Sequence, residues 1–260
     1  MKVTVCQLRS EPAGLVADWE KLVNHVEHAR SDLVLLPEMP FYPWPFWQRR
    51  FHEATWQASL AAHDEWQERL SALHPAVVLA SRPVGASTRR LNEGFYWQDG
   101  TYCRAHHKYY LPDESGFWEA SWYERGDGRF IPTTIAMTEG QKLYVGFLVC
   151  TELWFMRQAR AYGQAGVHLL ATPRATEKHT VDKWLAGGRA AAVIAGAFSL
   201  SSNHFSRSER PVPLGGQGWV IDPDGDVLAL TTPQEPFATV EIDPNAAERA
   251  KQTYPRYVLD

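Results

Sequence analysis

The hydrophobic positions of this chain recur with the periods of strands and helices in alternation from the first residues onward. Residues 3–8 form a short apolar run that predicts a strand. Residues 15–30 carry apolar side chains at helical spacing, which predicts an amphipathic helix. A second apolar run over 32–36 predicts a buried strand. The chain therefore begins with a strand, a helix and a strand, the unit that makes its two strands parallel.

The strongest strand signal lies in the middle of the chain, over 143–155, LYVGFLVCTELWF. Its first half is almost continuously apolar, which is typical of a central strand covered on both faces. The run ends at Cys150, and an amphipathic pattern begins at Phe155. This places a thiol at the carboxyl end of a buried strand, where open α/β sheets hold their chemistry.

The same periods continue through the rest of the chain. Helices are predicted over 52–73, 155–166 and 181–195, and strands over 76–80, 95–97, 102–105, 131–137, 141–149, 167–172, 198–202, 218–221, 227–230 and 237–242. Hairpin turns are expected at Gln98-Asp99-Gly100 and at Glu139-Gly140. No linker-like stretch divides the chain, so we predict one α/β domain over residues 1–260.

Composition narrows the class of partner. The net charge of −4 argues against nucleic acid or an anionic membrane as the main partner. No apolar run approaches the length of a membrane span, and the first residues lack the apolar segment of a signal peptide, so a cytoplasmic protein is expected. The three cysteines have no framework spacing and are expected to be free thiols. The aromatic and proline run over 41–47 is expected to line a pocket or pack on a partner subunit.

Three residues with chemical potential fall at loop positions after predicted strands. Glu38 stands between prolines after the second strand, in position for general acid–base work, although an exposed loop glutamate is the common alternative. Lys108 follows the hairpin among aromatic residues and suits stabilisation of an oxyanion. For Cys150 the sequence leaves two readings, a nucleophile whose thiol pKa a helix N-terminus lowers, or a small buried apolar residue.

The order of these residues and their flanking motifs resembles that of the nitrilase or carbon–nitrogen hydrolase superfamily. The matching stretches are LVLLPE over 33–38, HKYYLP over 107–112 and VGFLVCTE over 145–152. A further family glutamate precedes a Gly-Asp pair by seven residues, which here selects Glu119 before Gly126-Asp127. The resemblance implies an α-β-β-α sandwich. It also implies a homodimer or higher homo-oligomer, formed through helices beside the cysteine strand and the C-terminal tail.

The resemblance also implies a role for each residue. Cys150 would attack the carbon of a C–N bond and form a thioester, with Glu38 transferring the protons. Lys108 and the backbone N–H of Thr151 would hold the oxyanion, and Glu119 would orient Lys108. No metal or organic cofactor is implied.

The substrate is expected to be a small-molecule amide. A nitrilase or an N-carbamoyl amidohydrolase would use the same residues, and a non-catalytic binding or assembly module is the alternative from another class. Arg174, after the strand over 167–172, is a candidate for binding a substrate carboxylate, with a surface salt bridge as the equal alternative. Trp44, Trp118 and Trp154 are candidates for the pocket wall. Thr151 and Glu152, beside the cysteine, depart from many amidases and are where substrate choice is expected to diverge.

Overall fold

The computed structural model describes residues 1–9, 11–137, 140–206 and 212–258, which form two facing sheet halves with helices on both outer sides. One half contains β1 (Lys2–Leu8), β2 (Leu33–Leu35), β3 (Val77–Ala86), β4 (Arg89–Gln98), β5 (Thr101–His107) and β12 (Phe237–Glu241). The other contains β6 (Thr133–Ala136), β7 (Lys142–Phe147), β8 (Leu169–Arg174), β9 (Phe198–His204), β10 (Trp219–Ile221) and β11 (Val227–Leu230). The halves are joined where the end of β1 pairs with the end of β9.

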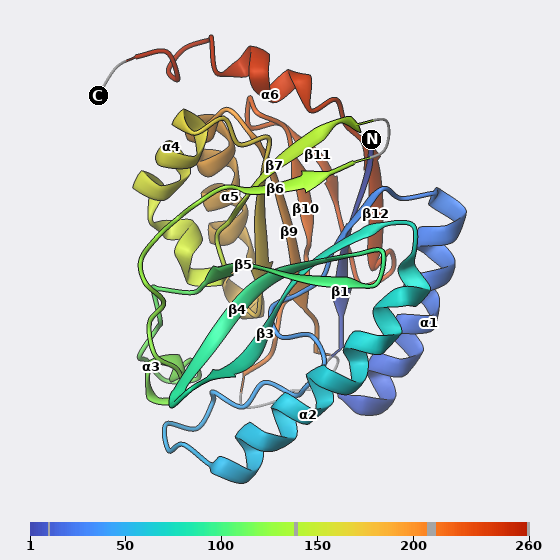
Figure 1. Ribbon diagram of the computed structural model, residues 1–260, viewed down its shortest axis with the longest axis vertical. Helices are drawn as coiled ribbons and strands as arrows, with labels where there is room; N and C mark the ends of the chain where they lie inside the picture. The colour runs from blue at the N-terminus through green and yellow to red at the C-terminus, as the bar shows by residue number, and fades with distance from the viewer. Residues whose placement is uncertain (10, 138–139, 207–211, 259–260) are drawn as a thin grey trace.

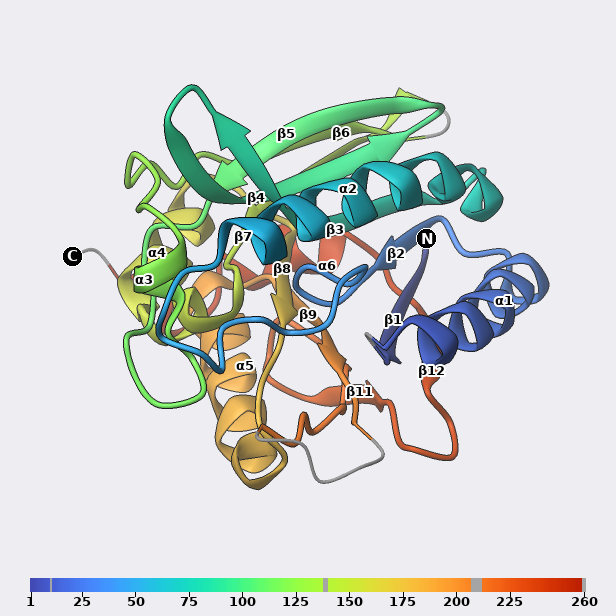
Figure 2. The ribbon, with the colours of Figure 1, turned by 90° about the horizontal axis from the view of Figure 1, so that it is seen from below.

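The helices cover the outer faces of the two halves (Figures 1 and 2). α1 (Pro12–Ala29) and α2 (Glu53–Arg69) lie against the first half, and α4 (Met156–Gln164) and α5 (Val181–Ala195) lie against the second. A short α3 (Glu119–Trp122) lies near one end of the sheets, and α6 (Asn245–Ala250) crosses the other end.

Three buried clusters explain this four-layer arrangement. One fills the space between the halves and joins side chains of the first half, such as Val5 and Leu35, to side chains of the second, such as Val145 and Leu169. A second cluster lies beneath α1, and a third lies beneath α4 and α5. The parallel strands therefore bury both faces, which is why they are nearly continuously apolar. The predicted α-β-β-α sandwich is confirmed.

The strand directions bring the candidate residues to one edge. β1, β2 and β3 are parallel, as are β7, β8 and β9. β4 runs antiparallel to β3, and β5 antiparallel to β4, so β5 again points in the direction of β3. The carboxyl ends of β2, β5, β7 and β8 therefore lie on the same side, and the segments that follow them carry Glu38, Lys108, Cys150 and Thr176.

The element boundaries differ from the predicted ones at informative places. β8 continues to Arg174 and β9 to His204, through polar residues that a strand pattern excludes but that are fully buried here. Residues Cys150–Trp154 form a 3₁₀ turn, and the α-helix begins only at Met156. The expected hairpin of β6 and β7 is present, but Glu139 of its turn lies outside the described residues.

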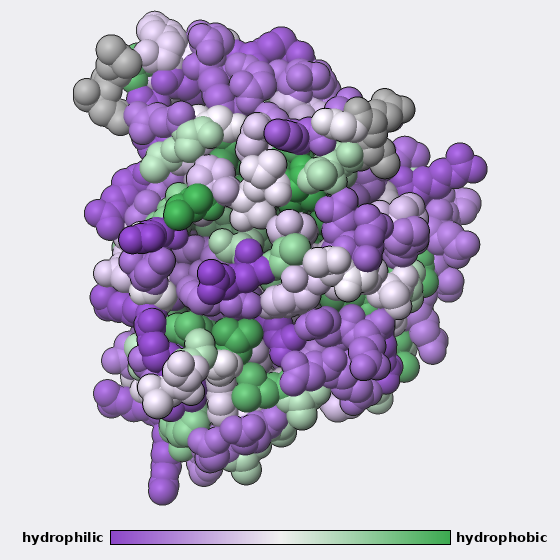
Figure 3. All heavy atoms as spheres, viewed as in Figure 1, coloured by the Kyte–Doolittle hydropathy of each residue, from purple (hydrophilic) through white to green (hydrophobic). Residues whose placement is uncertain are grey.

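No helix in the described ranges is both long enough and apolar enough to cross a bilayer. On the face viewed in Figure 3, apolar residues form small separate patches among hydrophilic ones.

Candidate active site

Lys108 lies at the centre of a buried charged cluster at the carboxyl edge of the strands. Its Nζ donates to Oε1 of Glu38 at 2.8 Å and to both carboxylate oxygens of Glu119, at 2.7 and 2.9 Å. All three side chains are fully buried. Burial alone would lower the pKa of Lys108, but the attraction of Glu119 and Glu38 outweighs it and raises that pKa above its ordinary value. The ammonium is therefore a fixed positive charge.

The two carboxylates around Lys108 do not share one environment. Burial, and to a smaller extent the charge of Glu38, raises the pKa of Glu119 to about 8 against the opposing attraction of Lys108. The raised pKa favours the protonated form of Glu119 near neutral pH.

Glu38 is held so that one of its oxygens stays available. Oε1 accepts from Lys108 and from Nδ2 of Asn92 on β4, the latter at 2.8 Å. Its backbone N–H donates to the carbonyl of Arg174, and its carbonyl lies 2.6 Å from Nε2 of His204. Oε2 is buried and has no hydrogen-bond partner among the described residues. This oxygen is therefore free to accept a hydrogen bond from another group in the site.

Cys150 adopts a strained backbone conformation at the end of β7. Its φ angle is +50°, in the left-handed region that non-glycine residues rarely adopt and that is concentrated at functional sites. Burial, followed by the charge of Glu38, raises the pKa of its thiol above the ordinary value, while Lys108 and the backbone N–H of Ala175 act in the opposite direction. The expectation of a helix-lowered pKa is wrong, because burial dominates and a 3₁₀ turn stands where a helix was expected. The thiol therefore needs a base to ionise it.

Glu152 braces the site instead of facing a substrate. Its fully buried carboxylate accepts from the backbone N–H groups of Val149 and Tyr109, at 2.9 and 2.7 Å, and from Nε2 of His106 at 2.9 Å. It thus joins the turn that contains Cys150 to the segment that begins at Lys108. The sequence places Glu152 beside the nucleophile but does not reveal these partners.

The aromatic run over 41–47 supports Glu119. Trp44 and Phe46 pack edge to face, and Phe46 also contacts the rings of Trp122 and Tyr123 at the end of α3. The backbone N–H of Trp118 donates to the carbonyl of Phe46 at 2.9 Å. Trp44 and Phe46 of this run therefore pack within the chain, and Phe46 contacts the short helix that carries Glu119.

A small cavity of about 90 Å³ opens beside Cys150. Thr151, Ala175 and Thr176 line it together with Phe117 and Trp184. The volume is below the ~150 Å³ of a cavity that holds benzene. The backbone N–H of Thr151 donates to no acceptor within the described part of the chain, so it is free for a bound molecule. The cavity thus fits a small group bonded to or approaching the thiol.

The remaining predicted binding residues lie around this cavity but outside its lining. Trp44 is buried and donates to the carbonyl of Gly116, and Trp118 stacks under the guanidinium of Arg49. Trp154 is 43% exposed and packs on Trp184, which itself lines the cavity.

Arg174 is fully buried behind the cavity, so the alternative that it forms a surface salt bridge is wrong. Its guanidinium donates to neutral oxygens only, of Ser201, Thr176 and Gln217, and lies 4.0 Å from the ring of Trp219. Burial lowers its pKa to about 9. No carboxylate of the described residues pairs with it.

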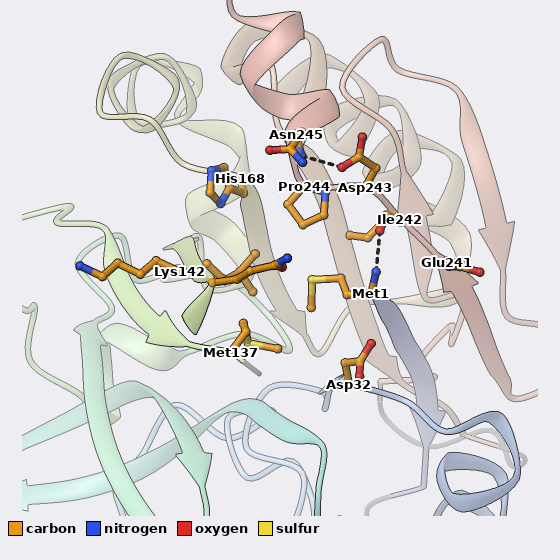
Figure 4. Close-up of a pocket in the computed structure, with 12 residues that line it drawn as sticks. Met1, Asp32, Met137, Lys142, His168, Glu241, Ile242, Asp243, Pro244 and Asn245 are labelled. Atoms are coloured by element: carbon orange, nitrogen blue, oxygen red, sulfur yellow. Dashed lines mark hydrogen bonds between the residues drawn. The ribbon is translucent and has the colours of Figure 1, made fainter. Parts of the chain in front are cut away.

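A much larger cavity, of about 610 Å³, lies at the opposite end of the sheets (Figure 4). It is formed at the amino ends of the strands, between Met1, Lys142, His168 and the segment around Ile242. Its polar groups are largely engaged with the chain, such as the amine of Met1 with the carbonyl of Ile242. Its lining contains no cysteine and no lysine–carboxylate cluster, so this larger cavity is not the candidate active site. No group of three or more possible metal ligands occurs in the described ranges.

Sequence reasoning missed Asn92, His204, Thr176 and Asn203. The available signal was polarity inside predicted strands, because Asn92 interrupts β4 and the end of β9 reads Ser-Ser-Asn-His. Buried polar residues need partners, and at a strand end these partners lie in the neighbouring loops. Which partners they have is visible only in the folded chain.

Comparison with known proteins agrees with this fold. A family model described as carbon-nitrogen hydrolase matches residues 2–252. The 2-oxoglutaramate amidase of Paenarthrobacter nicotinovorans is 20% identical over 98% of this chain and 87% of its own length. A carbon–nitrogen hydrolase of Helicobacter pylori superposes with a TM-score of 0.86 at 20% identity, covering 99% of this chain and 94% of that one. An amidase of Nesterenkonia superposes with a TM-score of 0.70 at 18% identity, covering 95% and 92%. The chain belongs to the carbon–nitrogen hydrolase family of the nitrilase superfamily.

Proposed function

We propose that this protein is an amidase that hydrolyses a small-molecule amide to a carboxylic acid and ammonia, with residues 1–260 acting as one catalytic domain. The observation that carries the proposal is that the two carboxylate oxygens of Glu38 have different partners. Lys108 and Asn92 hold its Oε1, while Oε2 is buried without a partner. A thiol with a raised pKa and a base with a free oxygen form a nucleophile–base pair.

In the first half of the reaction, the Cys150 sulfur attacks the amide carbon as Glu38 takes the thiol proton. The oxyanion that forms is held by Lys108 Nζ and the Thr151 backbone N–H. Glu38 then gives its proton to the amide nitrogen, the C–N bond breaks and ammonia leaves. A thioester on Cys150 remains.

In the second half, Glu38 takes a proton from water, and the resulting hydroxide attacks the thioester carbon. The same two donors hold the second oxyanion. The C–S bond breaks, the proton returns to sulfur and the acid leaves. Glu119 touches no reacting atom in this scheme and acts by positioning Lys108, whose Nζ donates to both of its side-chain oxygens.

The relatives favour an amide over the other C–N substrates. Two proteins similar to this chain are named as amidases, one of them a 2-oxoglutaramate amidase. The test is a matched set of an amide, a nitrile and an N-carbamoyl compound that share one small organic group. We expect ammonia from the amide, and intact-mass spectrometry should show an acyl adduct on Cys150.

Two variants serve as controls for this experiment. Cys150→Ala should lose both ammonia release and the adduct, whereas Cys103→Ala, a partly exposed thiol outside the site, should keep both. Activity on the nitrile alone would make the protein a nitrilase, and activity on the N-carbamoyl compound alone an N-carbamoyl amidohydrolase. No turnover and no adduct with any member would favour a non-catalytic binding or assembly module.

We also propose that the protein forms a homodimer or higher homo-oligomer. Tyr254 and Tyr257 in the C-terminal tail are 74% and 60% exposed, and large exposed aromatic side chains are typical of contact surfaces. Sedimentation of the wild-type chain and of a Tyr254→Ser, Tyr257→Ser double variant tests this. A monomeric wild-type protein would contradict it.

A further inference from the structure

The side-chain hydroxyl of Thr176 already accepts two hydrogen bonds and can only donate a third. Its Oγ1 accepts from Nη1 of Arg174 at 2.9 Å and from Nδ2 of Asn203 at 3.0 Å. A hydroxyl oxygen has two lone pairs and one hydrogen, so both acceptor positions are filled. The O–H therefore remains as a donor.

The orientation of Asn203 is fixed by the backbone. Its Oδ1 accepts from the N–H of Thr176 at 2.9 Å, which only an oxygen can do, so the amide nitrogen must face Oγ1. The same nitrogen also donates to the carbonyl of Gly216 at 2.7 Å. Asn203 is fully buried on β9, where it pairs with Arg174 at the end of β8, two residues before Thr176. The donor role of the Thr176 hydroxyl is thus imposed by the fold.

The hydroxyl lies beside the nucleophile. Thr176 lines the cavity that contains Cys150, and the preceding residue, Ala175, directs its backbone N–H to the Cys150 sulfur. No acceptor for the Thr176 hydrogen occurs among the described residues. An acyl group on Cys150 would lie within reach of this donor, with Phe117 and Trp184 as the apolar walls around its carbon chain.

Charge indicates what the donor recognises. Arg174 is a buried cation that donates only to neutral oxygens, and one of its hydrogen bonds runs directly into Thr176. A buried charge is costly without a counter-charge nearby. The cavity also contacts Glu114 and Glu177, but these side chains are exposed and half-buried, so water screens them more than it screens Arg174.

We propose that Thr176 binds a carboxylate carried by the acyl group of the substrate, so that the protein prefers monoamides of short dicarboxylic acids to amides of neutral acids of the same shape. This inference rests on the proposed amidase function and adds its specificity. The hydroxyl donates to the carboxylate, and Arg174 behind it strengthens the donor and supplies the missing charge balance. The cavity volume of about 90 Å³ restricts the acyl group to a few carbon atoms.

The test compares amides of equal shape and different charge. Malonamate is paired with 3-methylbutanamide, and succinamate with 4-methylpentanamide, because an isopropyl group replaces the carboxylate in each pair. We expect the wild-type protein to favour at least one anionic member in kcat/KM, as measured by ammonia release. Thr176→Val should lower the ratio of anionic to neutral kcat/KM by about 10- to 100-fold, the effect of losing one hydrogen bond to a charged group, mainly through KM.

Two further variants separate recognition from folding. Thr176→Ser keeps the hydroxyl and should keep the ratio within about threefold of wild type on the same scale. Thr172→Val is the matched control, because Thr172 is buried on β8, the strand that precedes Thr176, and lies outside the cavity lining. It should leave the ratio unchanged. A wild-type protein without preference for either anion, or an equal loss on both members of a pair in Thr176→Val, would overturn the inference.

A second measurement does not depend on turnover. Malonate and 3-methylbutanoate, the corresponding acids, compete with iodoacetamide for the site, and peptide mass spectrometry follows alkylation of Cys150. Malonate should protect at a lower concentration in the wild type, and Thr176→Val should remove that advantage. Equal protection by both acids would refute the role of Thr176. Failure of all four amides to release ammonia would instead refute the amidase function, so the two failures are distinguishable.

Discussion

The carboxylate of Glu152 accepts a hydrogen bond from the backbone N–H of Tyr109 at 2.7 Å. This bond links the residue after Lys108 to a residue two positions beyond Cys150. The same carboxylate accepts from the N–H of Val149, so it fixes the residues on either side of the site. The relative position of ammonium and thiol therefore depends on a side chain that faces neither.

Replacement of Glu152 by Gln is expected to impair both stability and turnover. An amide places an N–H₂ donor where the carboxylate accepts from Tyr109, Val149 and His106, so one donor meets another. We expect a loss of about 2–4 kcal/mol in the free energy of unfolding. We also expect kcat to fall more than KM rises, because the Lys108–Cys150 geometry is disturbed.

Urea unfolding and steady-state kinetics measure these effects, with Glu65→Gln, a side chain at the surface of α2, as the control. A Glu152→Gln protein with wild-type stability would show that the brace is dispensable.

Alkylation of Cys150 should depend on Glu38. The thiol has a raised pKa, so it reacts as fast as Glu38 can take its proton, and iodoacetamide carries the carboxamide that the site is proposed to bind. We expect Cys150 to be modified before the partly exposed Cys103, and Cys6, fully buried with its pKa raised to about 12, to react last.

Glu38→Gln should slow the modification of Cys150 at least tenfold, a loss on the scale of a missing general base, and leave Cys103 unaffected. Time-resolved peptide mass spectrometry gives both rates within one sample, so Cys103 serves as an internal control. Equal slowing of both thiols would point to a general structural change instead.

Gly126 is required because the backbone of His107 lies against it. A methyl group there would overlap the carbonyl oxygen of His107, and the N–H of Gly126 donates to the carbonyl of Lys108 at 2.9 Å. Backbone cannot yield as a flexible side chain can, so Gly126→Ala should displace Lys108. We expect kcat/KM to fall by about 100-fold or more, as for a misplaced catalytic group.

Gly85→Ala is the matched control, because a methyl group at Gly85 meets open space. Ammonia release by the two purified variants makes the comparison. Similar activity in both would contradict the tight fit at Gly126.

The raised pKa of Glu119 predicts a pH dependence of stability. Its pKa is about 8 in the folded protein against 4.5 in its ordinary state, so between these values the folded protein binds the extra proton. The free energy of unfolding contributed by Glu119 is then fully present below about pH 4.5 and falls as the pH rises to about 8. Glu119→Gln removes this slope.

Urea unfolding of wild type and Glu119→Gln at pH 5.5 and 7.5 tests the sign. The stability of the wild type relative to the variant should fall by about 1–3 kcal/mol between the two pH values. An unchanged difference, or one that grows with pH, would mean that Glu119 stays ionised beside Lys108.

The sequence by itself determined the layers of strands and helices and the reactive residues at their ends. Apolar runs and helical periods predicted the strands and helices, since burial on both faces of a strand leaves little choice of side chain. Strand ends preceding Glu38, Lys108 and Cys150 placed these residues at one edge, because parallel strands end on the same side. The resemblance to the carbon–nitrogen hydrolase superfamily selected Glu119 through its spacing to Gly126, where the structure leaves no room for a side chain.

Only the tertiary structure decided the hydrogen bonds and the electrostatic balance at the carboxyl edge of the strands. The free oxygen of Glu38, the raised thiol pKa of Cys150, the brace of Glu152 and the donor role of Thr176 all depend on partners tens of residues away. A local pattern reports which side chains are buried, but hydrogen-bond direction and electrostatic balance depend on which groups meet there. Asn203 and Thr176 meet because β8 and β9 pair in one register, which no periodicity along the chain records.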